Sequence, residues 1–420
     1  MPGADRLAAA HTRFRRRNAC RGGSWSADAR VSRGTPDAAR LRRGLDSSRS
    51  QTMLQHPDFL VVGAGLTGAT LARLLADAGH RVVVVERRDR IAGNLHDSVH
   101  ESGIRIHDHG PHYFRTSSAW IWDFVNRFAS FHPFEARIKS LVDGEHVSWP
   151  LGRAYIERRI GAWQPPPRTH GARDFEEAAL SLMPAPVYET FVKPYNEKQW
   201  GVPAHSLSAD LCKRFDVRED NDDRLTPKAT FQGVPRQGYA AMLQAMLSGI
   251  PVLMNQHFRA ASDWLAPKRL TFFTGPIDEY FDYCDGRLLY RAQRRAHRWL
   301  PDTDLHQPCV QVNNPLHEAG PHIRTIEWKH LMPEAYRQRI TGTVLTTETP
   351  YTPDDPAEYE YPFPDAANQA LYRRYRERAD AVPNVVFCGR LGEYRYLDMD
   401  QAIGRAQTIA NRVLEGREAA

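Results

Sequence analysis

The segment Gly63-Ala-Gly65-Leu-Thr-Gly68 restricts the fold more than any other feature of the chain. It follows the short apolar run 59–62, which is typical of a buried parallel strand, and it begins the Ala- and Leu-rich stretch 67–78, which is typical of a helix. A second apolar run, 81–86, ends on Glu86, 23 residues after Gly63. In this context G-x-G-x-x-G predicts the β-α-β unit of a dinucleotide-binding domain, and a purely structural glycine-rich turn is the weaker alternative.

Each residue of this motif has an expected physical role. Gly63 permits the tight turn, Gly65 lets a pyrophosphate approach the backbone, and Gly68 lets helix and strand pack closely. The helix N-terminus presents unpaired N–H groups and a positive dipole end to the phosphates. Glu86 is expected to accept hydrogen bonds from both ribose hydroxyls.

The next segment distinguishes FAD from NAD. Residues 87–94 form a second element that contains Gly93 and three arginines. Flavoproteins of the glutathione-reductase-like group place such an element directly after the acidic residue, against the pyrophosphate and the ribityl chain. Near the C-terminus, Cys388-Gly389-Arg390 precedes a helical stretch, as expected for a late element that closes on the same cofactor. FAD is therefore favoured over NAD.

Composition excludes a collagen-like and a wholly disordered chain. The 420 residues are 41% apolar and 25% charged, which are ordinary globular values. Residues 1–52 hold 12 Arg, no Lys and 4 Asp, a net charge of +8, so that the rest of the chain carries −2 of the overall +6. We expect a disordered or mis-annotated Arg-rich leader before a true start at Met53, with an organelle transit peptide as the alternative. Because the basic charge belongs to this leader, no nucleic-acid partner is expected.

The apolar and cysteine patterns set further expectations. The longest clearly apolar stretch without a charge or His is 59–72, 14 residues, whereas a membrane-spanning helix needs about 20. The five cysteines are scattered without a C-x-x-C pair, and the 18 histidines show no metal-ligand spacing. We therefore expect no membrane span, no metal and a reducing, cytoplasmic location.

The mixed order of elements predicts an α/β fold. We expect an FAD-binding Rossmann-like core of the glutathione-reductase type, with an inserted helical domain and an antiparallel β-sheet domain. Helical texture dominates 118–132, 174–215, 367–382 and 399–414, whereas 250–258, 268–274, 286–298, 308–313, 322–329 and 340–348 are expected as strands of the antiparallel sheet. The expected domains are 53–135 with 232–262 and 380–420 for FAD, 150–231 for the helices and a mobile lid, and 136–149 with 263–379 for the substrate-binding sheet.

Beyond the fingerprint, a series of short strings carries a resemblance to a known family. In chain order these are 63–68, 91–94, 110–114, 195–201, 231–235, 274–278, 290–291, 360–362 and 389–399. In order and spacing they resemble the UDP-galactopyranose mutases, and the resemblance covers essentially all of residues 57–415.

The resemblance implies a flavoenzyme of the isomerase class. Members of this family interconvert UDP-galactopyranose and its furanose form through an adduct of the sugar with N5 of reduced FAD, with no net redox change. The implied partners are a UDP-sugar and NAD(P)H or another reductant, homodimers are common among relatives, and the product serves cell-wall or polysaccharide biosynthesis. An FAD-dependent amine or alcohol oxidase and an inactive flavin- or nucleotide-sugar-binding protein are the alternatives.

The resemblance also assigns the site residues. The implied catalytic residues are Arg291 and Arg218 for the diphosphate, the latter on the lid, and His112, whose backbone carbonyl is expected near flavin N5. Substrate binding is implied for Val192, Tyr195, Asn196, Trp200, Phe231, Tyr361 and Tyr396 together with the two arginines. Cofactor binding is implied for Gly63, Gly65, Thr67, Gly68, Glu86, Arg87, Asn94, Pro111, His112, Arg390, Leu397, Asp398 and Met399.

Several positions depart from the family pattern. Ala92 replaces the first Gly of the usual Gly-Gly-Asn, Phe231 stands where Tyr is common, and Ala136 lies near a nucleotide-binding Asn of the family. Loss of polar contacts changes which sugar fits, because a site built for a hydroxyl rejects a substrate that lacks it. A deoxy- or acetamido-sugar nucleotide, or one with another base, is therefore an open alternative to UDP-galactose.

Overall fold

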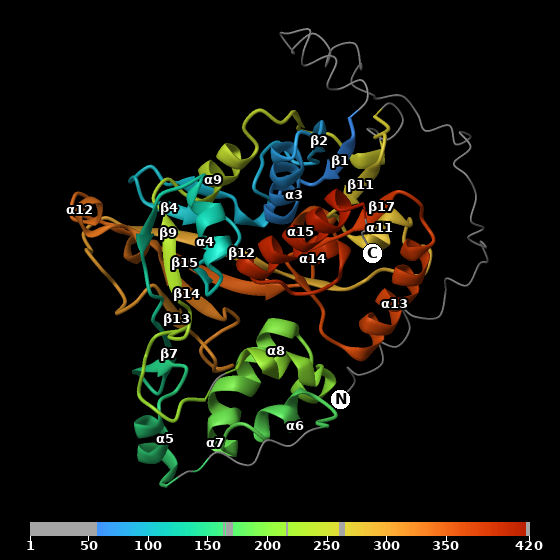
Figure 1. The fold of residues 1–420 in the computed structure, drawn as a ribbon. Helices are drawn as coiled ribbons and strands as arrows, with labels where there is room; N and C mark the ends of the chain where they lie inside the picture. Colours follow the sequence, from blue (N-terminus) through green and yellow to red (C-terminus); the bar gives the residue numbers. More distant parts are fainter. Residues whose placement is uncertain (1–56, 163, 165–170, 216, 260–264, 417–420) are drawn as a thin grey trace. The chain divides into compact units, whose positions relative to one another are not determined.

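A computed structural model describes residues 57–416, apart from 163, 165–170, 216 and 260–264 (Figure 1). The expected leader, 1–52, and the expected start at Met53 lie outside the described residues. No helix of the described part is long and apolar enough to cross a membrane.

A parallel sheet contains the β-α-β unit that the fingerprint predicts. Its five strands lie in the order β10-β2-β1-β11-β17, and all neighbouring pairs are parallel. β1 and β2 bury all of their residues, as expected for a sheet covered on both faces. The strands are β1 (Phe59–Val62), β2 (Val82–Val85), β10 (Val252–Leu253), β11 (Leu270–Phe273) and β17 (Val385–Phe387).

Two strands of this sheet correct an expectation. The segments 250–258 and 268–274 were expected in the antiparallel sheet, but they contribute β10 and β11 to the parallel sheet. A short β-branched or aromatic run does not encode the direction of its neighbour, because the partner strand is distant in sequence. The strand β11 thus lies in the parallel sheet, although 263–379 was expected in the substrate-binding domain. The domain boundaries themselves stay a prediction.

Two glycines act in the first turn as the motif predicts. Gly63 has φ +101°, and a Cβ there would lie 2.2 Å from Thr274 Oγ1. A Cβ on Gly68 would lie 2.0 Å from the Gly63 carbonyl oxygen, so only glycine allows helix α3 (Leu66–Asp77) to pack this closely on β1. Helix α15 (Met399–Leu414), which has the predicted bounds, packs along α3 through apolar residues at helical spacing (Figure 1).

A seven-stranded mixed sheet forms the second layer of the fold. Its order is β16-β12-β15-β14-β13-β7-β8, and only the β13–β7 pair is parallel. The long strand β12 pairs with β15 from Ala292–Tyr351 to Leu300–Thr343. The strands are β7 (Ile138–Val142), β8 (Glu145–Trp149), β12 (Tyr290–Leu300), β13 (Gln311–Asn313), β14 (Arg324–Glu327), β15 (Thr343–Tyr351) and β16 (Tyr361–Pro362).

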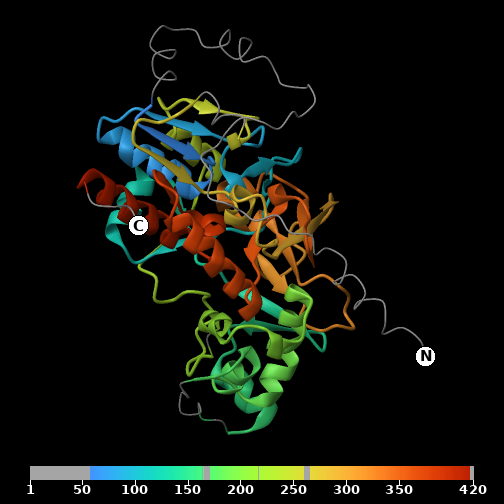
Figure 2. The ribbon, with the colours of Figure 1, turned by 90° about the vertical axis from the view of Figure 1, so that its right-hand side faces the viewer.

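The helical region has an apolar core of its own. This core buries Phe175, Tyr188 and Val192 among others. The helical region lies at the end of the described fold that is far from β1 and β2 (Figures 1 and 2). The expected helical stretch 174–215 breaks before Pro184 and at Pro203, whereas 185–200 stays helical because Pro186 and Pro194 lie in the first turns of α7 and α8. The elements are α5 (Arg153–Ile160), α6 (Phe175–Leu180), α7 (Ala185–Val187), a π-helical turn (Tyr188–Val192), α8 (Lys193–Trp200) and two 3-10 turns (Ala204–Ser206, Ala209–Arg214).

Smaller elements join these layers. β5, β9 and β6 form an antiparallel sheet, and β3 pairs with β4. Their bounds are β3 (Asp97–Val99), β4 (Arg105–His107), β5 (Phe114–Thr116), β6 (Phe131–Pro133) and β9 (Phe231–Pro235), and the remaining helices are α4 (Ala119–Asn126), α9 (Tyr239–Met246), α11 (Ile277–Tyr280), α12 (Glu334–Arg337), α13 (Ala366–Asp380) and α14 (Gly389–Gly392).

Candidate functional site

A pocket lies where the layers meet. Its walls come from the loop 109–113 before β5, from α8, from strands β7, β13 and β14, and from the first residues of α15. The pocket therefore joins the side of the fold on which the cofactor is expected to the helical region, as a site for two ligands requires.

Many of the predicted site residues are brought together here. The pocket is lined by Asn94, Pro111, His112, Tyr195, Asn196, Trp200, Tyr361, Arg390, Tyr396, Asp398 and Met399. The other predicted residues do not line it: Gly63, Gly65, Thr67, Gly68, Glu86, Arg87, Val192, Arg218, Phe231, Arg291 and Leu397. The roles of both sets stay predictions.

Arg291 caps the C-terminal end of α8. Its side chain is buried, and it donates to the Gln199 carbonyl oxygen at 2.7 Å, to that of Lys198 at 3.4 Å and to Thr352 Oγ1 at 2.8 Å. Burial lowers the pKa of Arg291 from its ordinary value. The guanidinium thus satisfies the last carbonyls of α8, where the helix dipole also favours a cation.

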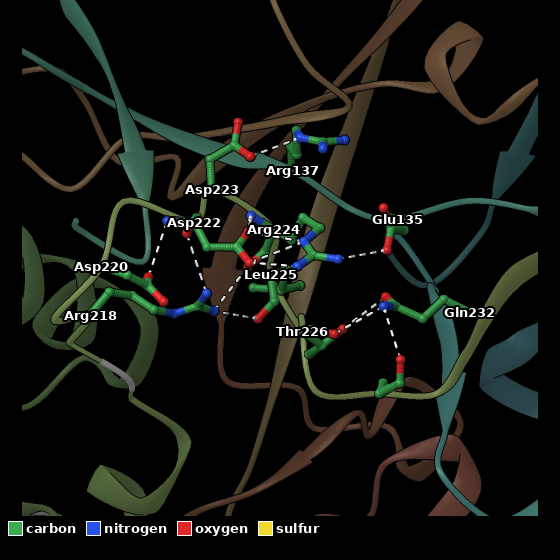
Figure 3. A network of polar contacts seen from close by, with 11 residues as sticks. Glu135, Arg137, Arg218, Asp220, Asp222, Asp223, Arg224, Leu225, Thr226 and Gln232 are labelled. Atoms are coloured by element: carbon green, nitrogen blue, oxygen red, sulfur yellow. Dashed lines mark hydrogen bonds and ion pairs between the residues drawn. The ribbon is translucent and has the colours of Figure 1, made fainter.

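Arg218 holds the loop 222–225 through its guanidinium (Figure 3). Its guanidinium donates to the carbonyl oxygens of Asp222, Arg224 and Leu225 at 3.3, 2.9 and 3.2 Å. An ion pair of 3.2 Å ties Arg224 to Glu135. Leu225 lines the pocket, so Arg218 is linked to the pocket through this loop and does not face it directly in this conformation.

Two arginines that the sequence reasoning missed line the pocket instead. Arg115 on β5 pairs with Asp398 at 2.9 Å, and Arg324 on β14 pairs with the buried Glu348. Arg115 directly follows the 110–114 motif, which could have drawn attention to it. Arg324 belongs to no local motif, and only the strand pairing brings it to the site.

The peptide group of His112 is fixed on both sides. Its N–H donates to Nδ1 of His107 at 3.1 Å, and its carbonyl oxygen accepts from the Tyr239 hydroxyl at 3.0 Å. Burial lowers the pKa of His107 to about 3, so this imidazole stays neutral and its Nδ1 remains an acceptor. The His112 carbonyl, expected near flavin N5, is thereby held in one orientation.

Aromatic rings and an arginine form one wall. The rings of Tyr361 and Tyr396 are nearly parallel, with centroids 6.1 Å apart. The guanidinium of Arg390 lies 4.6 Å from the Tyr396 centroid and donates to the carbonyl oxygens of Glu360 and Leu397. Leu397 therefore contributes through its backbone, next to the pocket rather than in its lining.

Phe231 lies elsewhere for a physical reason. Its ring stacks on Trp122, with centroids 5.4 Å apart and 9° between the planes. This face of the β5-β9-β6 sheet is packed against α4 and does not open into the pocket.

The residues present fit an FAD molecule. The two glycine-rich turns approach each other so closely that a Cβ on Gly93 would lie 3.1 Å from the Gly65 Cα, which keeps side chains away from the N-terminus of α3. Each Glu86 oxygen accepts one backbone N–H, from Ala64 and from Arg88, and retains a second lone pair for a hydroxyl. The buried Nδ1 of His112 has no partner among the described residues, as expected beside a polar ligand.

No candidate metal centre accompanies this site. Within the described residues, no group of three or more His, Cys, Asp or Glu side chains is placed to hold an ion.

Comparisons with known proteins find two matching family models. The family model for UDP-galactopyranose mutase matches residues 190–396, and that for an NAD(P)-binding Rossmann-like domain matches residues 61–128. The chain is 32% identical to a dTDP-fucopyranose mutase of Escherichia coli, over 86% of this chain and 99% of the relative. It is 30% identical to a probable UDP-galactopyranose mutase of Klebsiella pneumoniae, over 86% and 96% of the two chains.

Solved structures share the fold. A crystal structure of reduced UDP-galactopyranose mutase superposes with a TM-score of 0.66 at 17% identity, covering 86% of this chain and 97% of the other. A putrescine oxidase matches with a TM-score of 0.56 at 14% identity, covering 86% and 99%. The predicted α/β Rossmann-like fold is confirmed, and with the sequence relatives these findings show that the chain belongs to the UDP-galactopyranose mutase family, a family of flavin-dependent isomerases.

Proposed function

We propose that the protein interconverts the pyranose and furanose forms of a nucleoside-diphosphate sugar, with UDP-galactopyranose or dTDP-fucopyranose as substrate. The observation that carries the proposal is one pocket that joins His112 and Asn94, on the expected cofactor side, to the tyrosines and arginines expected to bind a diphosphate. Two relatives of near-equal identity carry different sugars and bases in their names, so both substrates belong in the test.

The diphosphate end is built from permanent cations and phenols. Arg324 and Arg115 line the pocket, with Tyr361 and Tyr396 beside them. Each arginine also has a carboxylate partner, which holds its side chain in place before a ligand arrives. We propose that these groups stabilise the negative charge that develops on the departing nucleoside diphosphate.

The aromatic part of the pocket lining suits a nucleobase. Phe191 and Trp149 line the pocket with ring centroids 6.1 Å apart, and Tyr195 adds a third aromatic side chain. Flat rings stack on a pyrimidine without discriminating between uracil and thymine. Apolar neighbours such as Leu225 exclude water that would hydrolyse an activated sugar.

When bound and reduced by NAD(P)H or another reductant, FAD supplies the nucleophilic nitrogen for chemistry at the anomeric carbon. The chain's own contribution on that side is the fixed carbonyl oxygen of His112, held by Tyr239. In this position it would accept a hydrogen bond from the reduced ring and favour that redox state.

The test is incubation of the dithionite-reduced holoenzyme with UDP-galactopyranose and, separately, dTDP-fucopyranose under anaerobic conditions. We expect a new isomer of unchanged mass, resolved by chromatography and NMR, and no turnover by the oxidised protein. In a parallel incubation of the oxidised holoenzyme in air, a product lighter by two hydrogens, formed with consumption of O₂ in proportion to product, would establish the oxidase alternative instead.

A matched pair of variants tests the diphosphate site. Arg324→Lys keeps the charge but loses the planar fork, so we expect sugar-nucleotide affinity to fall by about tenfold. Arg298→Lys, on an exposed position of β12, should leave affinity unchanged. Equal affinities of the two variants would remove Arg324 from the proposed site.

A further inference from the structure

A histidine and a carboxylate that the proposed reaction does not use lie at the pocket. His109 lines the pocket, and its Nδ1 lies 3.2 Å from Glu360 Oε1. Glu360 is buried and is bound by Arg295 through both oxygens, at 2.7 and 3.0 Å. This places a histidine in front of a carboxylate that is itself anchored from behind.

The pair determines which nitrogen of His109 carries the proton. Burial alone would raise the pKa of Glu360, but the hydrogen bond from His109 and the charge of Arg295 lower it overall. The ionised carboxylate only accepts hydrogen bonds, so Nδ1 of His109 must be the donor. In the neutral ring Nε2 is then an acceptor, fixed in direction by the Nδ1 contact.

This acceptor lacks a partner in the described part of the chain. Nε2 of His109 is buried, although 13% of the side chain as a whole is exposed. A buried polar atom without a hydrogen bond costs about 1–3 kcal/mol, so such atoms in functional pockets usually face a ligand group. Asn94 and Arg390, which also line the pocket, direct their N–H donors to backbone carbonyl oxygens and not to His109.

We propose that His109 Nε2 accepts a hydrogen bond from a hydroxyl group of a bound polyol, with Glu360 as the positioning residue that orients the ring. Because the inference rests on the proposed function, two molecules can supply that hydroxyl: the ribityl chain of FAD and the sugar of the nucleotide substrate. The chemistry of recognition is the same in both cases, and the experiment separates them.

Two substitutions at position 109 isolate Nε2. In His109→Asn the amide takes the place of Nδ1, so the contact with Glu360 is retained and the acceptor is lost. In His109→Gln the longer side chain places an amide oxygen near the position of Nε2. The readouts are the Kd of FAD for the apoprotein, from quenching of flavin fluorescence, and the Kd of UDP-galactose for the oxidised holoenzyme, which is not expected to turn over, from equilibrium dialysis.

The chain offers a closely matched control. His96 Nδ1 lies 2.7 Å from Asp108 Oδ2, a second histidine–carboxylate pair that is not part of the pocket lining. His96→Asn repeats the chemical change 13 residues earlier in the chain. It should leave both dissociation constants unchanged, and melting temperatures of all variants identify any that fail to fold.

For His109→Asn we expect one Kd to rise about five- to tenfold, the size of one hydrogen bond, and His109→Gln to restore it to within about twofold. A weaker FAD complex identifies the ribityl chain, whereas unchanged FAD binding with weaker UDP-galactose binding identifies the sugar. If both constants of the folded His109→Asn protein equal those of His96→Asn, or if folded His109→Gln binds as weakly as His109→Asn, the proposal is overturned. Neither readout depends on turnover, so failure of the mutase assay gives a separate result.

Discussion

Among single residues, Tyr239 has a defined relation to the site that its position in the sequence does not show. Its hydroxyl donates to the His112 carbonyl oxygen. The backbone N–H of Tyr239, at the start of α9, donates to the buried Asp97. Asp97 is paired in turn with Arg105. A run of contacts thus extends from a partly exposed ion pair to the carbonyl oxygen expected beside flavin N5.

Tyr239→Phe removes only the hydroxyl. We expect the midpoint potential of bound FAD to fall by about 20 mV, equivalent to roughly 1 kcal/mol for a two-electron couple, because the acceptor for the reduced ring is no longer held in place. Spectroelectrochemical titration measures this value. Tyr375→Phe is the control, since the Tyr375 hydroxyl also donates to a backbone carbonyl, that of Gly286 at 2.6 Å, outside the pocket. Equal potentials for the two variants would mean that Tyr239 is only structural.

Among the elements, α8 is the one whose ends determine the pocket wall. It contributes Tyr195, Asn196 and Trp200 to the lining, and its last carbonyls are bound by Arg291. Family resemblance places Arg291 on the diphosphate, whereas its contacts in this structure are those of a helix cap. These two roles predict different consequences of the same substitution.

Arg291→Met tests the capping role. Loss of charged donors from buried carbonyls should lower the free energy of unfolding by about 2–3 kcal/mol and speed hydrogen exchange of amides in 193–201. Urea denaturation and exchange mass spectrometry measure the two effects, with Arg294→Met on the exposed face of β12 as the control. Weaker sugar-nucleotide binding at unchanged stability and exchange would instead favour direct contact with the diphosphate.

For the whole molecule, the sequence predicted what depends on local pattern. The β1-α3-β2 unit and the bounds of α15 follow from apolar periodicity and from glycines whose Cβ atoms would collide with backbone, and these features lie close together in the chain. The pocket arginines were not predictable in this way. Arg291 on β12 and Arg324 on β14 lie in one sheet on either side of β15, and only strand pairing and side-chain direction decide that Arg324 reaches the pocket. The pairing of His109 with Glu360 could not be predicted from local sequence, because the two residues are 251 positions apart.

The stability of the whole fold should also depend on pH through the buried histidine His107. Burial lowers its pKa from 6.5 to about 3, so the unfolded chain binds a proton throughout this interval while the folded chain does not. The stabilisation is therefore complete above pH 6.5 and is lost by about 1.4 kcal/mol per pH unit as the pH falls toward 3.

His107→Asn keeps an acceptor oxygen for the His112 N–H and cannot be protonated. Urea unfolding between pH 4 and pH 6.5 should show a pH slope of the unfolding free energy that is smaller by one proton than in the parent protein. The slope should not vanish, because burial also holds the pKa of His112 well below its ordinary value. His146→Asn, at an exposed position of β8, should keep the parent slope. A slope unchanged by His107→Asn would mean that the imidazole titrates normally, and that acid unfolding of this protein begins elsewhere.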